Sequence, residues 1–401
     1  MKKFSFVIIT YNYKDYLVNC LESLNKQLGF SPDEYEVVIV DDGSNDGTYE
    51  CIQKMNLTYS LEYIYINRTE KSCRNAARNR GWKIAKGETI VFLDADMIIN
   101  NSYLKNLNMC YEVNSDIAVV GMRFMLDEPV HPCEVSDGSI FSKININKPE
   151  MKYYEDRHYY FNKLSYNPSS YTNMWLYFYT CNVSIPKKYL KLVGGFNENI
   201  RGWGFDDQEL GYRLTKAGVK LVLNHKLEGL HQYHGEVYGT LRSTDKVLEQ
   251  YKNVAIIYRT YKDLNKVIPK LKVIVYSSLK MHTRLNKKVV KSSKKHLIHV
   301  ENSSSLEKIK NSIKDLANIQ GNEIIVHDHL ENSDLHIWVQ FLGETKGSVK
   351  YFPVSRILDK KSIKNHMKYL KKKYPNNRLV WLMKIFFLAF IKQPFIKLLR
   401  H

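Results

Sequence analysis

Two carboxylates separated by one residue, Asp94 and Asp96, directly follow a short apolar stretch of the chain. This stretch, Thr89–Leu93, is apolar or β-branched throughout and predicts a buried strand. Hard divalent cations take oxygen ligands, and Mg²⁺ is commonly held by one or two carboxylates together with substrate phosphates. The pair therefore indicates a metal site at a strand end. The alternative is that the two aspartates only open a turn, where Asp is common.

A second acidic pair, Asp206 and Asp207, follows Trp203, which has a glycine on each side. Gly202 and Gly204 allow a tight turn that presents the indole. The two acids then stand at the predicted start of a helix, where the macrodipole favours anions. They could simply complement that helix end, but the tryptophan directly before them favours a binding site.

Two histidines, His231 and His234, lie three residues apart further along the chain. Imidazole is a common metal ligand, so one of them could supply a nitrogen to the cation. The spacing alone does not decide between this interpretation and two structural histidines.

Alternating strands and helices must position these groups. The predicted strands are 4–9, 35–40, 61–66, 89–93, 117–125, 180–186 and 219–223, and the predicted helices are 14–25, 72–85, 101–110 and 187–192. This order is typical of βαβ units and predicts an α/β fold with a mostly parallel sheet. Ligands of such sheets gather at the carboxyl ends of the strands, so we expect Thr10, Asp41 and Asp94 at one rim. Neither a Gly-x-Gly-x-x-Gly fingerprint nor a P-loop lysine is present.

The composition is that of a folded protein with a basic surface. The 401 residues are 44% hydrophobic and 25% charged, and the formal net charge is +19. Such a charge favours an anionic partner, and without a recognised nucleic-acid module we do not expect nucleic acid. Six dispersed cysteines and a first strand in place of a signal peptide predict a cytoplasmic protein.

The chain resembles the family 2 nucleotide-sugar glycosyltransferases in three stretches, VIITYN, VIVDDGSNDGT and CRNAARNRGWKIAKGETIVFLDADM. A fourth stretch, GGFNENIRGWGFDDQELGYRL, resembles the acceptor-side motif of galactosyl- and N-acetylhexosaminyl-transferases of the chondroitin-polymerase and β-galactosyltransferase type. The common form of that motif is Trp-Gly-Gly-Glu-Asp, whereas this chain has Trp-Gly-Phe-Asp-Asp. The resemblance implies the GT-A fold, a Rossmann-like and mostly parallel central sheet flanked by helices.

The resemblance also implies a role for individual residues. On the donor side, uracil, ribose and phosphates of UDP would be contacted by Thr10, Tyr11, Asp41, Arg78, Asn79, Asp94 and Ala95. Asp96 would bind Mn²⁺ or Mg²⁺, with His231 or His234 completing the metal site. The acceptor side would be formed by Gly202, Trp203, Asp206 and Asp207, with Asp206 holding the acceptor hydroxyl and Asp207 as the general base.

With these roles, the resemblance implies an inverting, metal-dependent transfer of a hexose or N-acetylhexosamine from a UDP-sugar to an acceptor hydroxyl. The acceptor stays open between a glycan, as in a cell wall or capsule, a lipid-linked oligosaccharide and a peptide. The alternative is a catalytically inactive nucleotide- or glycan-binding protein with the same fold. A sugar-nucleotide pyrophosphorylase is disfavoured because the chain lacks the glycine-rich, lysine-bearing first loop of those enzymes.

The sequence predicts a boundary near residue 253, with a GT-A domain at 1–253 and a smaller α/β appendage at 254–401. In the appendage we expect strands at 272–276, 296–300, 323–327 and 335–341 and a helix at 306–319. An apolar run at 379–392, with basic flanks, is too short to span a bilayer. It indicates either peripheral attachment to the anionic inner face of the cell membrane, or a terminal helix packed on the appendage or in a homodimer.

Overall fold

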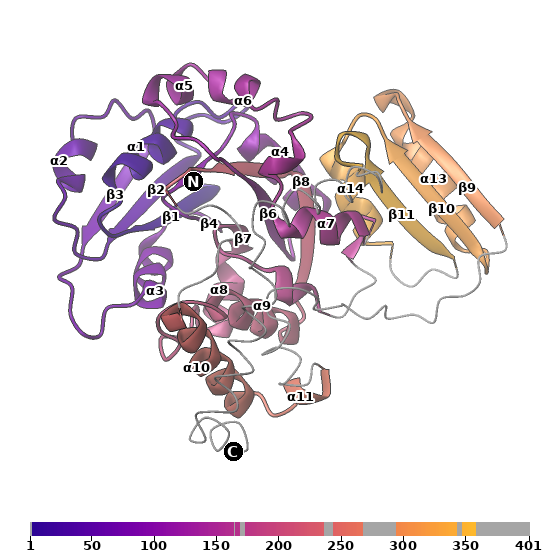
Figure 1. Ribbon diagram of the computed structural model, residues 1–401. Helices are drawn as coiled ribbons and strands as arrows, with labels where there is room; N and C mark the ends of the chain where they lie inside the picture. The colour runs from indigo at the N-terminus through magenta and orange to yellow at the C-terminus, as the bar shows by residue number, and fades with distance from the viewer. Residues whose placement is uncertain are drawn as a thin grey trace.

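The computed structural model describes residues 2–163, 165–168, 173–235, 244–267, 294–342 and 347–357 (Figure 1). Its larger sheet has the strand order β3-β2-β1-β4-β7-β6-β8-β5. The strands are β1 (Phe4–Thr10), β2 (Tyr35–Asp41), β3 (Ser60–Tyr65), β4 (Thr89–Leu93), β5 (Met97–Ile98), β6 (Ile117–Met125), β7 (Asn182–Pro186) and β8 (Lys220–His231). The first four are parallel, and β7 runs antiparallel to both of its neighbours. The predicted α/β fold with a mostly parallel central sheet is confirmed.

Helices cover both faces of this sheet (Figure 1). The described helices in this part of the chain are α1 (Lys14–Ser23), α2 (Thr48–Ile52), α3 (Arg74–Ile84), α4 (Tyr103–Val113), α5 (Pro132–Ser136), α6 (Ser139–Lys143), α7 (Asp156–Lys163), α8 (Lys187–Val193), α9 (Asp206–Lys216), α10 (Thr244–Thr260) and α11 (Leu264–Val267), with 3-10 turns η1 (Met151–Tyr153) and η3 (Met174–Tyr177). Of these, α10 and α11 lie away from the sheet, beyond α9 (Figure 1). Phe6 and Ile8 of β1 pack in one cluster with α1 and α4, whereas Val7 packs in another with α3. This alternation is the period of a strand that is buried on both faces.

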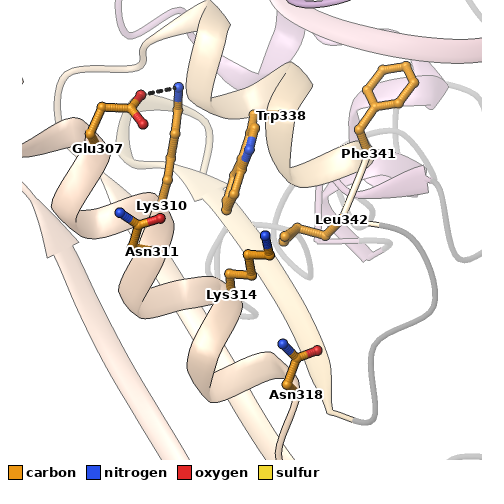
Figure 2. Close-up of a pocket in the computed structure, with 8 residues that line it drawn as sticks. All are labelled: Glu307, Lys310, Asn311, Lys314, Asn318, Trp338, Phe341 and Leu342. Carbon is orange, nitrogen blue, oxygen red and sulfur yellow. Dashed lines mark hydrogen bonds and ion pairs between the residues drawn. The ribbon is translucent and has the colours of Figure 1, made fainter.

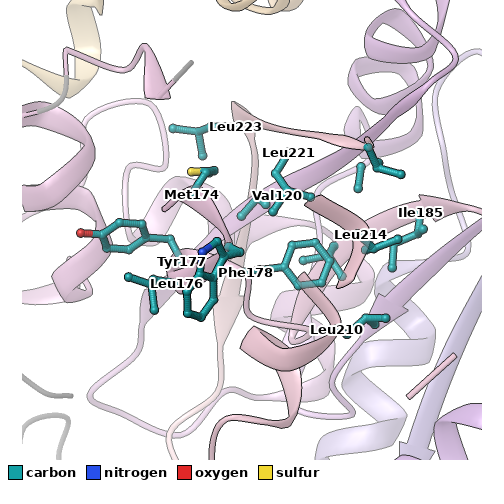
Figure 3. Close-up of a cluster of buried hydrophobic side chains, with 14 of the residues drawn as sticks. Val120, Met174, Leu176, Tyr177, Phe178, Ile185, Leu210, Leu214, Leu221 and Leu223 are labelled. Carbon is teal, nitrogen blue, oxygen red and sulfur yellow. The ribbon is translucent and has the colours of Figure 1, made fainter. Parts of the chain in front are cut away.

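The aromatic segment between residues 127 and 173 contributes largely to packing. Tyr154, Phe161 and Tyr166 are all buried. The following turn η3 lies in the same hydrophobic cluster as Phe178 and Leu210 (Figure 3). These described aromatic residues therefore serve to fill the core.

The C-terminal appendage has a second sheet with three parallel strands in the order β11-β10-β9. Its elements are β9 (Lys294–Val300), η4 (Ser303–Ser305), α13 (Leu306–Ala317), β10 (Asn322–Asp328), α14 (Ser333–Gln340), β11 (Ser348–Pro353) and η5 (Val354–Arg356). The predicted strands at 296–300 and 323–327 and the predicted helix at 306–319 are confirmed. The predicted strand at 272–276 and the apolar run at 379–392 lie outside the described residues.

The predicted strand at 335–341 is wrong, because this stretch forms α14. Ile337 and Val339 are β-branched and favour a strand by propensity. Asn332, however, caps the helix by accepting hydrogen bonds from the backbone N–H of Asp334 and Leu335 at 2.8 and 3.3 Å. The helix is buried on most sides, so its apolar residues run almost continuously and do not reveal a helical period.

Helix α14 joins the appendage to the larger sheet through polar contacts with β8. The Gln340 side chain accepts from Leu223 N at 3.0 Å and donates to Leu223 O at 2.8 Å, as a neighbouring strand would. After β11, Arg356 forms a buried ion pair with Glu228 of β8, with 2.5 Å between Nη2 and Oε2. The predicted domain boundary at residue 253 falls within α10.

Among the residues that the structure describes, none of the helices has both the length and the apolar character needed to cross a membrane.

Candidate active site

Three parallel strands bring the predicted donor residues to one edge of the larger sheet. Thr10 and Asp41 are register partners at the ends of β1 and β2, and β4 on the other side of β1 leads into Asp94. The convergence expected from the strand order is therefore present. Thr10 is buried, and its hydroxyl has no hydrogen-bond partner among the described residues.

Asp41 is fully buried at this edge and holds the following turn. Its Oδ1 accepts from Ser44 N at 2.7 Å, and its Oδ2 accepts from the Tyr63 hydroxyl. Next to it, 44% of Tyr11 is exposed, and the Arg68 guanidinium lies 3.9 Å from the ring centroid. Arg68 thus covers one face of the Tyr11 ring, and the exposed remainder of the ring can contact a flat, hydrogen-bonding base.

Arg68 also binds Asp42, with 2.7 Å between Nη1 and Oδ2. The sequence places Asp42 with Asp41 at the end of the second strand but assigns it no role. Sequence reasoning missed Arg68, which stands in an irregular segment without a motif.

A short strand pairing brings Asp96 and His231 together. Met97 of β5 pairs with His231 at the end of β8, and Gln232 N donates to Asp96 O at 2.9 Å. The side chains meet with 3.3 Å between His231 Nε2 and Asp96 Oδ2. His234 Nε2 lies 3.8 Å from the same carboxylate oxygen. The three predicted metal-ligating residues thus form one cluster, with a ligand atom of each within 4.8 Å of the others.

The backbone fixes which nitrogen of His231 faces Asp96. His231 Nδ1 lies 3.0 Å from Gln232 O, and a carbonyl oxygen can only accept, so Nδ1 carries the proton. Nε2 therefore presents its lone pair to the cluster, which is the arrangement expected of a metal-ligating histidine. Burial, together with the nearby Arg123, lowers the pKa of His231 to about 3, which keeps the ring neutral.

Asp96 is buried, and its Oδ1 has no hydrogen-bond partner within the described part of the chain. Burial raises the pKa of Asp96, although Arg123 and His234 oppose this effect. An unpaired buried carboxylate oxygen is costly unless another group binds it. The cluster of one carboxylate and two imidazoles fits a divalent transition metal better than Mg²⁺, which prefers oxygen ligands.

Arg78 of α3 connects the two acidic pairs. The side chain is buried, and its Nη1 lies 3.0 Å from Asp206 Oδ2 and 3.7 Å from Asp207 Oδ1. Its Nη2 lies 3.5 Å from Asp94 Oδ1. Although burial opposes its charge, these three carboxylates raise the pKa of Arg78. The end of β4 and the start of α9 are thereby held in one charged network.

The two acids of α9 have different environments. Asp206 is buried and is paired with both Arg78 and Arg74, whose Nη2 lies 3.5 Å away. Asp207 accepts a hydrogen bond from the Thr180 hydroxyl, and 22% of its side chain remains exposed. Burial and the neighbouring Asp206 raise the pKa of Asp207 to about 6, with Arg78 opposing them. Asp207 is therefore the more accessible of the two carboxylates, and its own pKa is raised.

The turn before these acids is held by α10. Trp203 N donates to Glu249 Oε2 at 2.8 Å, and Asn253 Nδ2 donates to Gly204 O at 2.8 Å. Gly202 has a φ of +71°, and a Cβ there would lie 2.6 Å from the carboxyl carbon of Glu249. The half-buried Trp203 is thus fixed at the entrance to α9. Sequence reasoning missed Glu249 and Asn253, because they follow the last motif.

Two residues predicted to contact the donor, Asn79 and Ala95, do not take part in the charged network or the carboxylate–imidazole cluster. Asn79 donates to Phe196 O and Glu198 Oε1 at 2.9 and 2.7 Å, and its carbonyl oxygen accepts from Phe196 N and Trp82 Nε1 at 2.8 and 2.9 Å. These bonds fasten the 194–198 turn to α3 and do not bring the Asn79 side chain to the acidic pairs. Ala95 is buried between Asp94 and Asp96.

The appendage has a separate pocket of about 320 Å³ between α13 and α14 (Figure 2). It is lined by Glu307, Lys310, Asn311, Lys314, Asn318, Trp338, Phe341 and Leu342. None of these residues belongs to the clusters described above, so the pocket is not part of the candidate active site.

Two family models match adjoining parts of the chain. Residues 5–173 match the model for glycosyl transferase family 2, and residues 163–235 match the model for the N-terminal domain of galactosyltransferase. The chain is 29% identical over 250 residues to validoxylamine A glucosyltransferase of Streptomyces hygroscopicus subsp. limoneus, covering 57% of this chain and 51% of that protein. It is 27% identical over 268 residues to chondroitin synthase of Escherichia coli, covering 63% of this chain and 37% of that protein.

The chain thus spans about half of the first relative's length and less of the second's. Among solved structures, the mannosyltransferase PcManGT from Pyrobaculum calidifontis, in complex with GDP-Man and Mn²⁺, is similar with a TM-score of 0.46 and 14% identity. That similarity covers 69% of this chain and 70% of the other.

Proposed function

Because this chain belongs to the family 2 glycosyltransferases and has their GT-A fold, we propose that it transfers a hexose or N-acetylhexosamine from a UDP-sugar to an acceptor hydroxyl with inversion. One observation carries the proposal. A carboxylate–imidazole cluster forms around Asp96, and two residues before it Asp94 shares Arg78 with the carboxylate of Asp207 at the rim of the sheet.

Asp96, His231 and His234 would hold the cation. The family resemblance implies Mn²⁺ or Mg²⁺, and we favour Mn²⁺ because Mg²⁺ prefers all-oxygen ligands. When bound, a divalent cation supplies Lewis-acid stabilisation of the UDP leaving group. The other donor contacts come from the chain itself. Tyr11 offers an exposed ring to the uracil, and Thr10 offers an unpaired hydroxyl beside it.

Asp207 would remove the proton from the acceptor hydroxyl. A pKa of about 6 makes it a stronger base than an ordinary carboxylate, yet leaves it ionised at neutral pH. Arg78 helps to keep Asp207 charged, and Asp206 is already occupied by two arginines. Since attack by a deprotonated hydroxyl in a single displacement inverts the anomeric centre, an α-linked donor would give a β-linked product.

The matches to chondroitin synthase and to hyaluronan synthase of Pasteurella multocida support a glycan as the acceptor. We therefore place the chain in polysaccharide biosynthesis. A lipid-linked oligosaccharide or a peptide would be detected by the same acceptor screen.

The proposal is tested by incubating the protein with a panel of UDP-sugars and Mn²⁺, first alone and then with glycan, lipid-linked and peptide acceptors. We expect UDP release from one donor, stimulation by a glycan acceptor, and a β-linkage in the product by NMR. UDP binding without turnover across the panel would instead establish the non-catalytic alternative. An α-linked product from an α-linked donor would contradict the single displacement.

A further inference from the structure

A second group of possible metal ligands lies in the appendage, outside the candidate active site. His299, Glu301 and His329 each present a ligand atom, and these atoms lie within 4.8 Å of one another. His299 is the last residue but one of β9, Glu301 directly follows that strand, and His329 directly follows β10. They share the carboxyl edge of a parallel sheet, where ligands of open α/β sheets gather.

The strand register places these histidines on one face. His299 is the register partner of His327, and His329 follows two residues later, so all three side chains point to the same side. His329 N donates to Val300 O at 3.0 Å, which extends the pairing beyond β10. The ring centroids of His299 and His329 are 5.4 Å apart. The two imidazoles are thus positioned by the backbone.

We propose that His299, Glu301 and His329 form a zinc-type metal site that joins the edge strand β9 to the end of β10. His299 Nδ1 and His329 Nε2 are 3.1 Å apart, and His329 Nε2 lies 4.0 Å from Glu301 Oε1. Ligand atoms about 2.0–2.1 Å from a tetrahedral Zn²⁺ lie about 3.3 Å from each other. The observed separations require only a small adjustment of Glu301, whose side chain is 72% exposed and free to rotate.

The chemistry of the ligands also selects the class of ion. Two imidazoles and one carboxylate suit Zn²⁺ and similar divalent transition metals, whereas Mg²⁺ and Ca²⁺ prefer all-oxygen sites. All three residues are exposed, so an ion can reach them from solvent without rearrangement of the fold. The bound ion would stabilise the native appendage by mass action.

Zinc content of the full-length chain tests the proposal. After equilibrium dialysis against micromolar Zn²⁺, we expect the double variant His299→Gln/His329→Gln to hold one ion per chain fewer than the wild type. His296→Gln is the matched control, because it removes a histidine from the same strand three residues earlier and on the opposite face. The control should keep the wild-type zinc content.

Hydrogen exchange on the wild type gives a readout that needs no variant to fold. Zn²⁺ should slow amide exchange in the segments around 299–301 and 327–331, and an Asp96→Asn variant should show the same protection. Unchanged exchange in these segments, or equal zinc content in the wild type and the double variant, would overturn the proposal. Neither result bears on glycosyl transfer, so this inference and the proposed function can fail separately.

Discussion

Asp207 combines a raised pKa with a side chain that still reaches solvent, which is the combination a general base requires. Replacing Asp207 with Asn should lower kcat by about 10²–10⁴ while the fold is retained. Asp315→Asn, which changes an exposed carboxylate on α13, is the matched control and should keep wild-type turnover. Near-normal UDP release by the Asp207 variant would show that another group accepts the proton.

The raised pKa also predicts a pH profile. The carboxylate must be ionised to accept a proton, so kcat/KM should fall as the pH drops through about 6. The measurement is the rate of UDP release between pH 5 and pH 8 at saturating Mn²⁺. An acid limb near pH 4, the range of an ordinary aspartate, would contradict the effect of burial and Asp206.

The raised pKa of Asp207, which favours activity at higher pH, lowers the stability of the native state at higher pH. A carboxyl whose pKa is raised on folding favours the native state below its unfolded pKa near 3.8, and this contribution is lost as the pH rises through about 6. Asp207→Asn should therefore be more stable than the wild type at pH 7.5 and equal to it near pH 3.5. Denaturant unfolding at the two pH values measures the difference, and a destabilised variant at pH 7.5 would reject it.

His231 and His234 should contribute unequally to metal binding. The register of β5 and β8 and the Nδ1 bond to Gln232 O fix the His231 ring, whereas His234 lies beyond the strand. His231→Ala should weaken Mn²⁺ binding by at least about 10-fold, and by more than His234→Ala does. Titration followed by electron paramagnetic resonance compares the two variants directly. Equal losses would mean that the strand does not preorganise the site.

At the scale of elements, the α/β order and most strand positions follow from apolar periodicity, because β1, β2 and β4 are buried on both faces. The predicted end of β8 at Leu223 is wrong, since the strand continues to His231. The missed part contains Asn224, His225 and Glu228, polar residues that are buried by contacts with the appendage. Local sequence cannot reveal such long-range burial.

Most residues of the candidate site could be predicted from the sequence, but their contacts with one another could not. Its acids and histidines stand at motif positions, so the sequence alone identifies them as candidate site residues. Their mutual contacts depend on β5, a strand of only two residues that no periodicity can indicate. The role of Arg78 as a bridge between acidic pairs likewise depends on the packing of α3 against α9 and could not be derived from spacing.

The turn before α9 departs from the family motif at Phe205, and its backbone conformation is strained there. Phe205 replaces the second glycine of Trp-Gly-Gly-Glu-Asp and has a left-handed backbone, with φ +65°, while its ring is buried. Only glycine adopts this conformation without a steric penalty. Phe205→Gly and Phe205→Ala both remove the ring, so we expect the glycine variant to be more stable by roughly 1 kcal/mol. Equal stability by denaturant unfolding would mean that this turn stores no strain.

For the whole molecule, the buried pair of Arg356 and Glu228 couples the appendage to the larger sheet. Arg356→Met leaves the buried Glu228 carboxylate with His158, 3.2 Å from its Oε1, and without its cationic partner, so it should cost about 3–5 kcal/mol of stability. The double variant Arg356→Met/Glu228→Gln removes that charge and should recover most of the loss. Thermal unfolding compares the variants, and no recovery in the double variant would show that packing around Arg356, not its charge, joins the two parts.

A titration with Mn²⁺ tests the central claim most directly. UDP release from the preferred UDP-sugar is measured in metal-free buffer and with increasing Mn²⁺, for the wild type and for Asp96→Asn. We predict that the wild type requires the metal and saturates with it, and that the variant shows little activity at the same concentrations because the cluster of Asp96, His231 and His234 has lost its carboxylate. Full activity of the wild type in excess chelator, or of the variant with Mn²⁺, would contradict the claim.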